Sequence, residues 1–131
     1  MVYRYSLEEE LSGIHEDMVE MGSLVEDSIE NTILALQNQD IALAKRIFRE
    51  DDRIDEIEQR IEKKCLMLIA RQQPIAKDLR AVSAALKIIT DLERIGDHSA
   101  DIAEITIRMA GEKYLKPLID VPKMAELAGI M

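Results

Sequence analysis

Apolar residues recur at every seventh position through the middle of the chain, at Ile47, Ile54, Ile61 and Leu68. Seven residues make almost two full turns of an α-helix, so these four side chains follow one line along its surface. The helix must end before Pro74, because proline lacks the backbone N–H that a continuing helix requires. The spacing therefore predicts a long amphipathic helix that packs lengthwise against helical partners.

The segment before this helix has the same character. Ser6 and Glu9 have the spacing of a capping box, in which each side chain bonds the backbone N–H of the other residue, so the first helix is expected to open at Leu7. Apolar residues then recur at steps of three and four as far as Leu36. Asp40 is placed to cap the second helix.

A third helical pattern follows Pro74. It begins near Ile75, places Asp78 in its first turn, where a negative charge is favourable, and runs to a stop at Gly111. Beyond it, residues 112–121 show no helical period, and Pro122 stands near the first turn of a further short helix.

The composition agrees with helices packed side by side. The 131 residues are 47% hydrophobic, but they include only three Tyr, one Phe and no Trp. This mixture suits long helices better than a compact sheet, and the length allows a single core. We expect an all-α protein in which residues 1–111 form an antiparallel three-helix bundle. Residues 112–131 would form a linker and a short helical stub.

Charge and cysteine content limit the classes of partner. The net charge of −9 argues against nucleic acid, which requires a basic surface. Cys65 is the only cysteine, and the apolar run from Cys65 to Ala70 is far shorter than the ~20 residues that span a bilayer. The N-terminal sequence lacks the apolar core of a signal peptide. We therefore expect a cytoplasmic protein without membrane insertion.

Carboxylates replace apolar residues in the buried stripe of the third helix. At 100° per residue, Glu93, Asp97 and Glu104 fall within about 20° of the line through Leu86. The second helix adds two aspartates at the edge of its own apolar stripe, and buried carboxylates need partners. The candidate metal ligands are Asp51, Asp55, Glu93, Asp97, Asp101 and Glu104.

Two interpretations of these carboxylates remain open. They could lie on a solvated surface in ion pairs with Arg46, Arg49 and Arg94, each worth ~0–1 kcal/mol. Alternatively, their mutual repulsion could be relieved by a bound cation. Ligands that are all oxygen suit Mg²⁺, Mn²⁺, Ca²⁺ or iron better than structural zinc, although the identity of the metal, zinc included, stays open.

Residues 93–104 also carry a resemblance to a known family. They read ERIGDHSADIAE, which resembles the ERxGDHxxNIAE motif of PhoU-type phosphate-uptake regulators. Residues 70–80 are similar to the ARQQPxAxDLR segment of that family, and residues 51–55 to its E/D-xxx-D motif. Asp101 stands where the family often has Asn. The family usually has two three-helix repeats, and this chain stops early in the second.

The resemblance implies a regulatory, non-catalytic protein that restrains phosphate uptake and phosphate signalling. Its expected partners are the ATPase subunit of the phosphate ABC importer and a sensor kinase, with the protein held peripherally at the inner face of the membrane through the transporter. The family's acidic motifs, matched here by Asp51, Asp55, Glu93 and Asp97, bind iron or other divalent metals. The alternative is a metal-binding or storage bundle without a phosphate role.

Two further expectations concern catalysis and assembly. A ferritin-like di-iron oxidase usually needs Glu-x-x-His pairs, and neither His15 nor His98 has Glu three residues earlier, which disfavours redox catalysis. Apolar residues of the stub, Met124, Leu127 and Ile130, would lack their usual partners. We therefore expect a homo-oligomer, such as a dimer.

Overall fold

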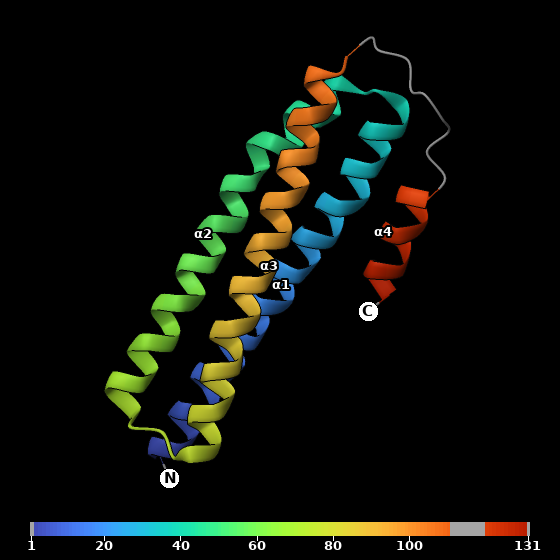
Figure 1. Ribbon diagram of the computed structural model, residues 1–131. Coiled ribbons are helices and arrows are strands. Elements are labelled where there is room, and N and C mark those ends of the chain that lie inside the picture. The colour runs from blue at the N-terminus through green and yellow to red at the C-terminus, as the bar shows by residue number, and fades with distance from the viewer. Residues whose placement is uncertain (1, 111–119, 131) are drawn as a thin grey trace.

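Three long helices pack along their full length, and a fourth, short helix lies beside the first (Figure 1). The computed structural model describes residues 2–110 and 120–130. The helices are α1 (Val2–Asn38), α2 (Ile41–Gln72), α3 (Ala76–Arg108) and α4 (Asp120–Ile130). Helices α1 and α2 run in opposite directions, as do α2 and α3 (Figure 1). The expected all-α fold and antiparallel bundle are confirmed.

The core follows the apolar lines read from the sequence. Ile47, Ile54, Ile61 and Leu68 are all buried, with at most 3% of each residue exposed. Ile54, Ile61 and Leu68 pack in one cluster with apolar residues of α1 and α3, which include Met21, Val82 and Ile89. Ile47 belongs to a second cluster, with Ala35 of α1 and Ala103 of α3. Burying one such side chain contributes about 1.5–3 kcal/mol, so the seven-residue spacing of α2 accounts for much of the packing.

The boundaries of α2 agree with expectation. The Asp40 carboxylate accepts a hydrogen bond from the backbone N–H of Leu43 at 3.1 Å, which caps the helix. The helix ends at Gln72, and Gln73 adopts a left-handed conformation with φ of 45° before Pro74. Helix α3 then begins at Ala76.

Two predicted boundaries were wrong. Helix α1 begins at Val2, not at Leu7, so Ser6 lies inside the helix. The Ser6 hydroxyl accepts a hydrogen bond from the Gln72 side chain at 3.2 Å, and this contact between helices takes the place of the expected cap. Helix α3 ends at Arg108, before Gly111, which lies outside the described residues.

Helix α4 packs on the second half of α1. Pro122 lies in its first turn, as expected, and Ala125, Gly129 and Ile130 line a hollow shared with Ile29 and Ile33 of α1. The opposite side of α4 is exposed: Met124 and Leu127 have 67% and 55% of their surface accessible. No helix among the described residues has both the length and the apolar character needed to cross a membrane.

Candidate metal centre

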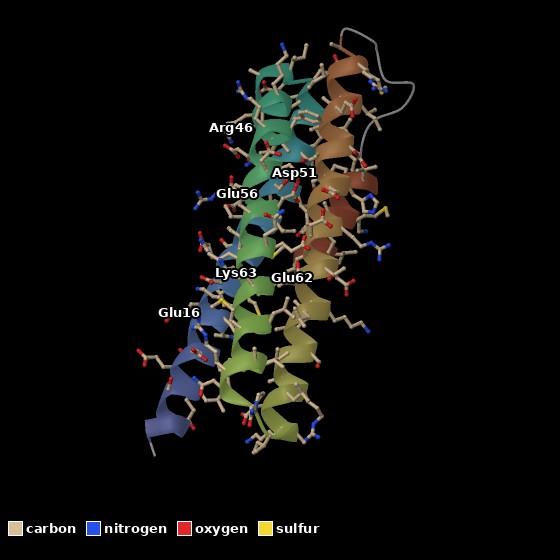
Figure 2. The ribbon with its side chains drawn as sticks, turned by 90° about the vertical axis from the view of Figure 1, so that its left-hand side faces the viewer. Glu16, Arg46, Asp51, Glu56, Glu62 and Lys63 are labelled. Carbon is tan, nitrogen blue, oxygen red and sulfur yellow. The ribbon has the colours of Figure 1, made fainter. Side chains whose placement is uncertain are left out.

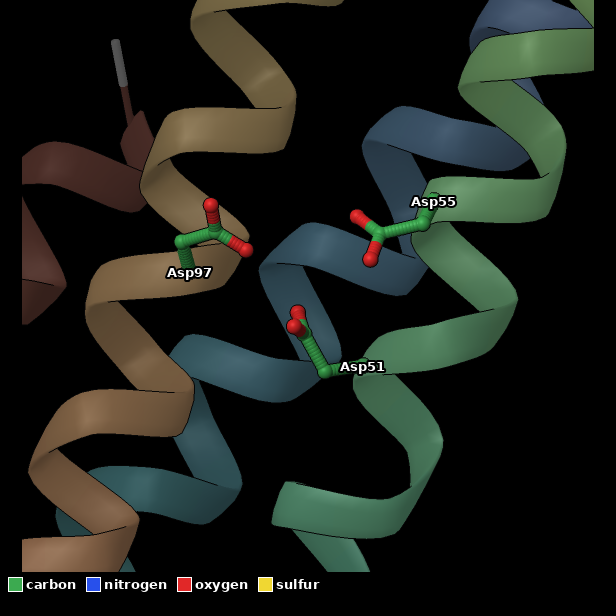
Figure 3. A group of neighbouring side chains, drawn as sticks. All are labelled: Asp51, Asp55 and Asp97. Atoms are coloured by element: carbon green, nitrogen blue, oxygen red, sulfur yellow. The ribbon is translucent and has the colours of Figure 1, made fainter.

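Acidic side chains from α2 and α3 face one another halfway along the bundle. Asp51 lies on the side of α2 that faces α3, whereas Arg46 and Glu56 extend from other sides of the helix (Figure 2). Asp51 and Asp55 are one turn apart on α2, and Asp97 approaches both from α3 (Figure 3). One carboxylate oxygen from each of these three aspartates lies within 4.8 Å of the other two.

A second group overlaps the first. Asp55, Glu58 and Glu93 also bring one oxygen each within 4.8 Å of one another. The two groups share Asp55, so five carboxylates form one continuous cluster. We call this the acidic cluster: Asp51, Asp55, Glu58, Glu93 and Asp97.

Only four of the six candidate metal ligands lie together in the structure. The structure brings Asp51, Asp55, Glu93 and Asp97 together, but Asp101 is exposed and belongs to neither group. Glu104 forms an ion pair with Arg108 of its own helix at 2.6 Å. The last two carboxylates of the α3 motif therefore lie apart from the cluster.

Glu58 is a member of the cluster that the sequence reasoning missed. It lies seven residues after Asp51 and three after Asp55, so all three side chains project from one side of α2. This spacing could have identified Glu58, but the E/D-xxx-D motif ends at Asp55 and does not include the next turn of the helix.

Close approach of the two helices beside Asp51 depends on Gly96. A Cβ at this position would lie 3.2 Å from Ile54 Cδ1 and 3.5 Å from Asp51 Oδ1. The glycine therefore mainly allows α3 to pack against Ile54 of α2, and it also leaves room beside the Asp51 carboxylate. It explains why a residue with low helix propensity occupies the interior of α3.

Crowding raises the pKa values of the cluster. Burial, followed by the charges of Asp55 and Asp97, raises the pKa of Asp51 to about 6. A hydrogen bond with Asp97, followed by burial, raises the pKa of Glu93 to about 7. Burial is also the main cause of the raised pKa values of Asp55 and Glu58. Each shift means that the folded protein disfavours the charged carboxylate at this place.

Basic side chains do not relieve this repulsion. Arg60 forms ion pairs with Asp17 and Glu20 of α1, and Arg53 also pairs with Glu20. These two arginines of α2 therefore bind carboxylates of α1 and not those of the acidic cluster. Within residues 6–110 and 121–130, no Lys or Arg forms an ion pair with the acidic cluster. The Arg46 side chain pairs instead with Glu50.

Two oxygens of the cluster lack any hydrogen-bond partner among the described residues. Asp51 Oδ1 and Asp55 Oδ1 are both inaccessible to solvent. A buried oxygen without a donor costs about 1–3 kcal/mol, and more when it is charged. Converging carboxylate oxygens of this kind are the ligands preferred by Mg²⁺, Ca²⁺ and Mn²⁺, so the residues fit a hard cation.

Comparison with known proteins identifies the family. The family model described as "PhoU domain" matches residues 18–106. The chain belongs to the PhoU family. It is 45% identical over 112 residues to the "Phosphate-specific transport system accessory protein PhoU homolog" of Clostridium acetobutylicum, covering 85% of this chain and 51% of that protein. A homolog of the same name from Aquifex aeolicus is 40% identical, with coverages of 90% and 53%.

Solved PhoU structures have the same fold. The crystal structure of PhoU from Pseudomonas aeruginosa matches with a TM-score of 0.89 and 30% identity, covering 94% of this chain and 59% of that one. The chain thus spans about half the length of the curated relatives it matches. The relatives are named accessory proteins, which agrees with the expected non-catalytic role of the PhoU family.

Proposed function

We propose that the protein is a regulatory module of phosphate uptake that acts by contacting the phosphate importer. Its membership of the PhoU family carries this proposal, because the relatives are named as accessory proteins of phosphate-specific transport. The expected contacts are with the ATPase subunit of the ABC importer, on the cytoplasmic side of the membrane, and with a sensor kinase. We also propose that the protein self-associates.

We further propose that the acidic cluster binds metal cations as part of this role. The two ligand groups share Asp55, which supports a pair of ions bridged by that carboxylate. The oxygens Asp51 Oδ1 and Asp55 Oδ1, which solvent does not reach, support the assignment of these two side chains as metal ligands. An oxygen-only set favours Mg²⁺, Mn²⁺, Ca²⁺ or iron over structural zinc. In this role the cation would neutralise the cluster and hold α2 and α3 together.

A phosphate-starvation reporter in a bacterium that lacks its own PhoU tests the regulatory role. Expression of this chain in phosphate-replete medium should lower reporter activity, and the purified chain should bind the purified ATPase subunit of the importer. Reporter activity measured with the double variant Asp51→Asn, Asp97→Asn tests whether regulation requires the acidic cluster. Unchanged reporter activity together with no binding to the ATPase subunit would refute the regulatory proposal.

The acidic cluster also favours a second candidate, a metal-binding or storage bundle without a phosphate role. The same reporter experiment, combined with a metal titration of the purified chain, separates the two functions. A storage bundle would bind several equivalents of iron or Mn²⁺ while leaving the phosphate reporter unchanged.

A further inference from the structure

A hollow of about 500 Å³ lies between α1 and α2, near the N-terminal end of α1. Its volume falls within the range of small-molecule sites in proteins, about 300–1,000 Å³. The wall combines apolar surface with carboxylates and basic groups. It includes Glu9, Glu10 and Gly13 of α1 and Lys64, Met67 and Arg71 of α2. We call this place the α1–α2 hollow.

The α1–α2 hollow is remote from the other features of the bundle. Among the described helices α4 contacts α1 alone, and it lies beside residues 26–34 of that helix (Figure 1). The hollow involves residues 6–14 of α1, so at 1.5 Å per residue the two places are at least about 18 Å apart. No residue of the acidic cluster lines the hollow. The hollow is therefore formed by α1 and α2 themselves.

Glu10 lacks a positive partner within the bundle. Its Oε2 atom is inaccessible to solvent, and its carboxylate forms no hydrogen bond or ion pair with any described residue. A buried carboxylate oxygen without a donor is unfavourable, and more so when it is charged. Lys64 lies on the opposite wall of the hollow, but it already pairs with Asp17 at 2.5 Å. A cationic donor that enters the hollow would therefore meet a carboxylate that has no competing partner.

The charges around the hollow indicate which ligand fits. Glu9, Glu10 and Asp17 supply three negative charges, whereas Lys64 and Arg71 supply two positive charges. One further positive charge would balance this set. Glu9 and Arg71 are exposed, so solvent screens their charges, whereas Glu10 is half-buried and would gain most from a cation. The net charge of −9 on the whole chain also attracts cations.

Gly13 and Met67 provide room and apolar surface beside Glu10. A Cβ at position 13 would have no atom within 4 Å, so helix packing does not require glycine there, in contrast to Gly96. Glycine is unfavourable inside a helix, and a larger side chain at this position would project into the hollow. Met67 is half-buried, and its unbranched side chain adapts to ligands of different shape. These features suit an unbranched aliphatic stem.

We propose that the α1–α2 hollow binds an aliphatic cation, a single positive charge carried on an unbranched apolar stem. The cation donates hydrogen bonds to the Glu10 carboxylate, and the stem lies over Gly13 and against Met67. Two sources carry this chemistry, a free alkylamine and the side chain of a protein lysine. The site uses neither the acidic cluster nor contact with the phosphate importer, so its failure would leave both of those proposals unchanged.

Titration of the whole chain with n-butylamine and with N-acetyl-lysine amide tests the site, because both carry the same ammonium group on the same stem. At constant pH and ionic strength, the backbone amide signals of Gly13 and Met67 in proton–nitrogen NMR spectra should shift and saturate. Sodium butyrate, which has a similar stem and the opposite charge, should leave them unchanged. The tighter of the two amines identifies the source. No saturable shift with either amine, or an equal shift with butyrate, would overturn the proposal.

Two matched pairs of variants test the place of binding. Glu10→Gln should weaken n-butylamine binding at least about fivefold, because it removes the charge and keeps the shape, whereas Glu30→Gln, exposed elsewhere on α1, should bind like the parent. Gly13→Leu should abolish binding by filling the hollow. Gly22→Leu should not, although a Cβ at position 22 also meets no atom within 4 Å. Circular dichroism should show all four variants folded, and unchanged binding in either Glu10→Gln or Gly13→Leu would contradict the proposal.

Discussion

Asp97→Asn changes the electrostatics of the acidic cluster with little change in shape. The Asp97 charge contributes to the raised pKa values of the other four carboxyl groups, Asp51, Asp55, Glu58 and Glu93. Removing this charge should lower those pKa values toward their ordinary range. The metal-free variant should consequently be more stable than the parent protein at neutral pH and above.

The sign of the pH dependence follows from the pKa values of the folded and unfolded chains. A carboxyl group with a raised pKa in the folded protein stabilises the fold fully below its unfolded pKa, and this contribution is lost as the pH rises through the folded pKa. For Asp51 those values are 3.8 and about 6, and for Glu93 they are 4.5 and about 7. The metal-free parent should therefore lose stability between about pH 4 and about pH 7.

The expected magnitude is modest. A pKa difference of one corresponds to about 1.4 kcal/mol. Glu93 and Asp51 are only partly buried and interact through the same Asp97, so solvent screening and shared interactions reduce the sum. We expect a loss of ~1–2 kcal/mol for the whole cluster. Asp97→Asn should recover about half of it at the upper end of this pH range.

Urea unfolding followed by circular dichroism measures this effect. The free energy of unfolding should be determined with a chelator at constant ionic strength from about pH 4 to about pH 8. Asp27→Asn, on an exposed position of α1 outside the cluster, is the matched control and should follow the parent. Parallel pH profiles for the parent and Asp97→Asn would refute the argument, because the repulsion assigned to Asp97 would then be absent.

Three other predictions follow from the packing and from the two ligand groups. Glu58→Gln should reduce the number of Mn²⁺ ions bound per chain from two to one in a calorimetric titration, because the second ligand group loses a charge; unchanged stoichiometry would contradict the bridged pair. Asp101→Asn should leave Mn²⁺ affinity within about twofold of the parent in the same titration, because this side chain is exposed outside both groups, and a tenfold loss would return it to the ligand set. Gly96→Val should destabilise the bundle by about 1–3 kcal/mol in urea unfolding, because the valine side chain would overlap Ile54. An unchanged urea midpoint would contradict the close packing of α2 and α3 at this position.

The fold was predictable because it depends on spacing. Ile47, Ile54, Ile61 and Leu68 are separated by whole pairs of turns, and the structure buries all four. The start of α1 was less predictable, since Ser6 can cap a helix or bond another side chain equally well. Its contact with Gln72, far away in the sequence, decides between the two.

The acidic cluster was predictable only in part. Helical spacing and the family resemblance both indicated Asp51, Asp55, Glu93 and Asp97, which the bundle brings together. Spacing along one helix cannot show how far a side chain lies from the neighbouring helix. Glu104, for this reason, was included although it pairs with Arg108, and Glu58 was overlooked although it faces Glu93.

Thermal unfolding of the parent chain with added Mn²⁺ tests most directly the claim that the acidic cluster is a cation site. A ligand that binds only the folded state stabilises it by about 2.7 kcal/mol at 100 times its dissociation constant, so the unfolding temperature should rise with Mn²⁺ concentration. The rise should be much smaller in Asp51→Asn, Asp97→Asn. A shift in the parent chain no larger than that produced by sodium chloride at equal ionic strength would contradict the account.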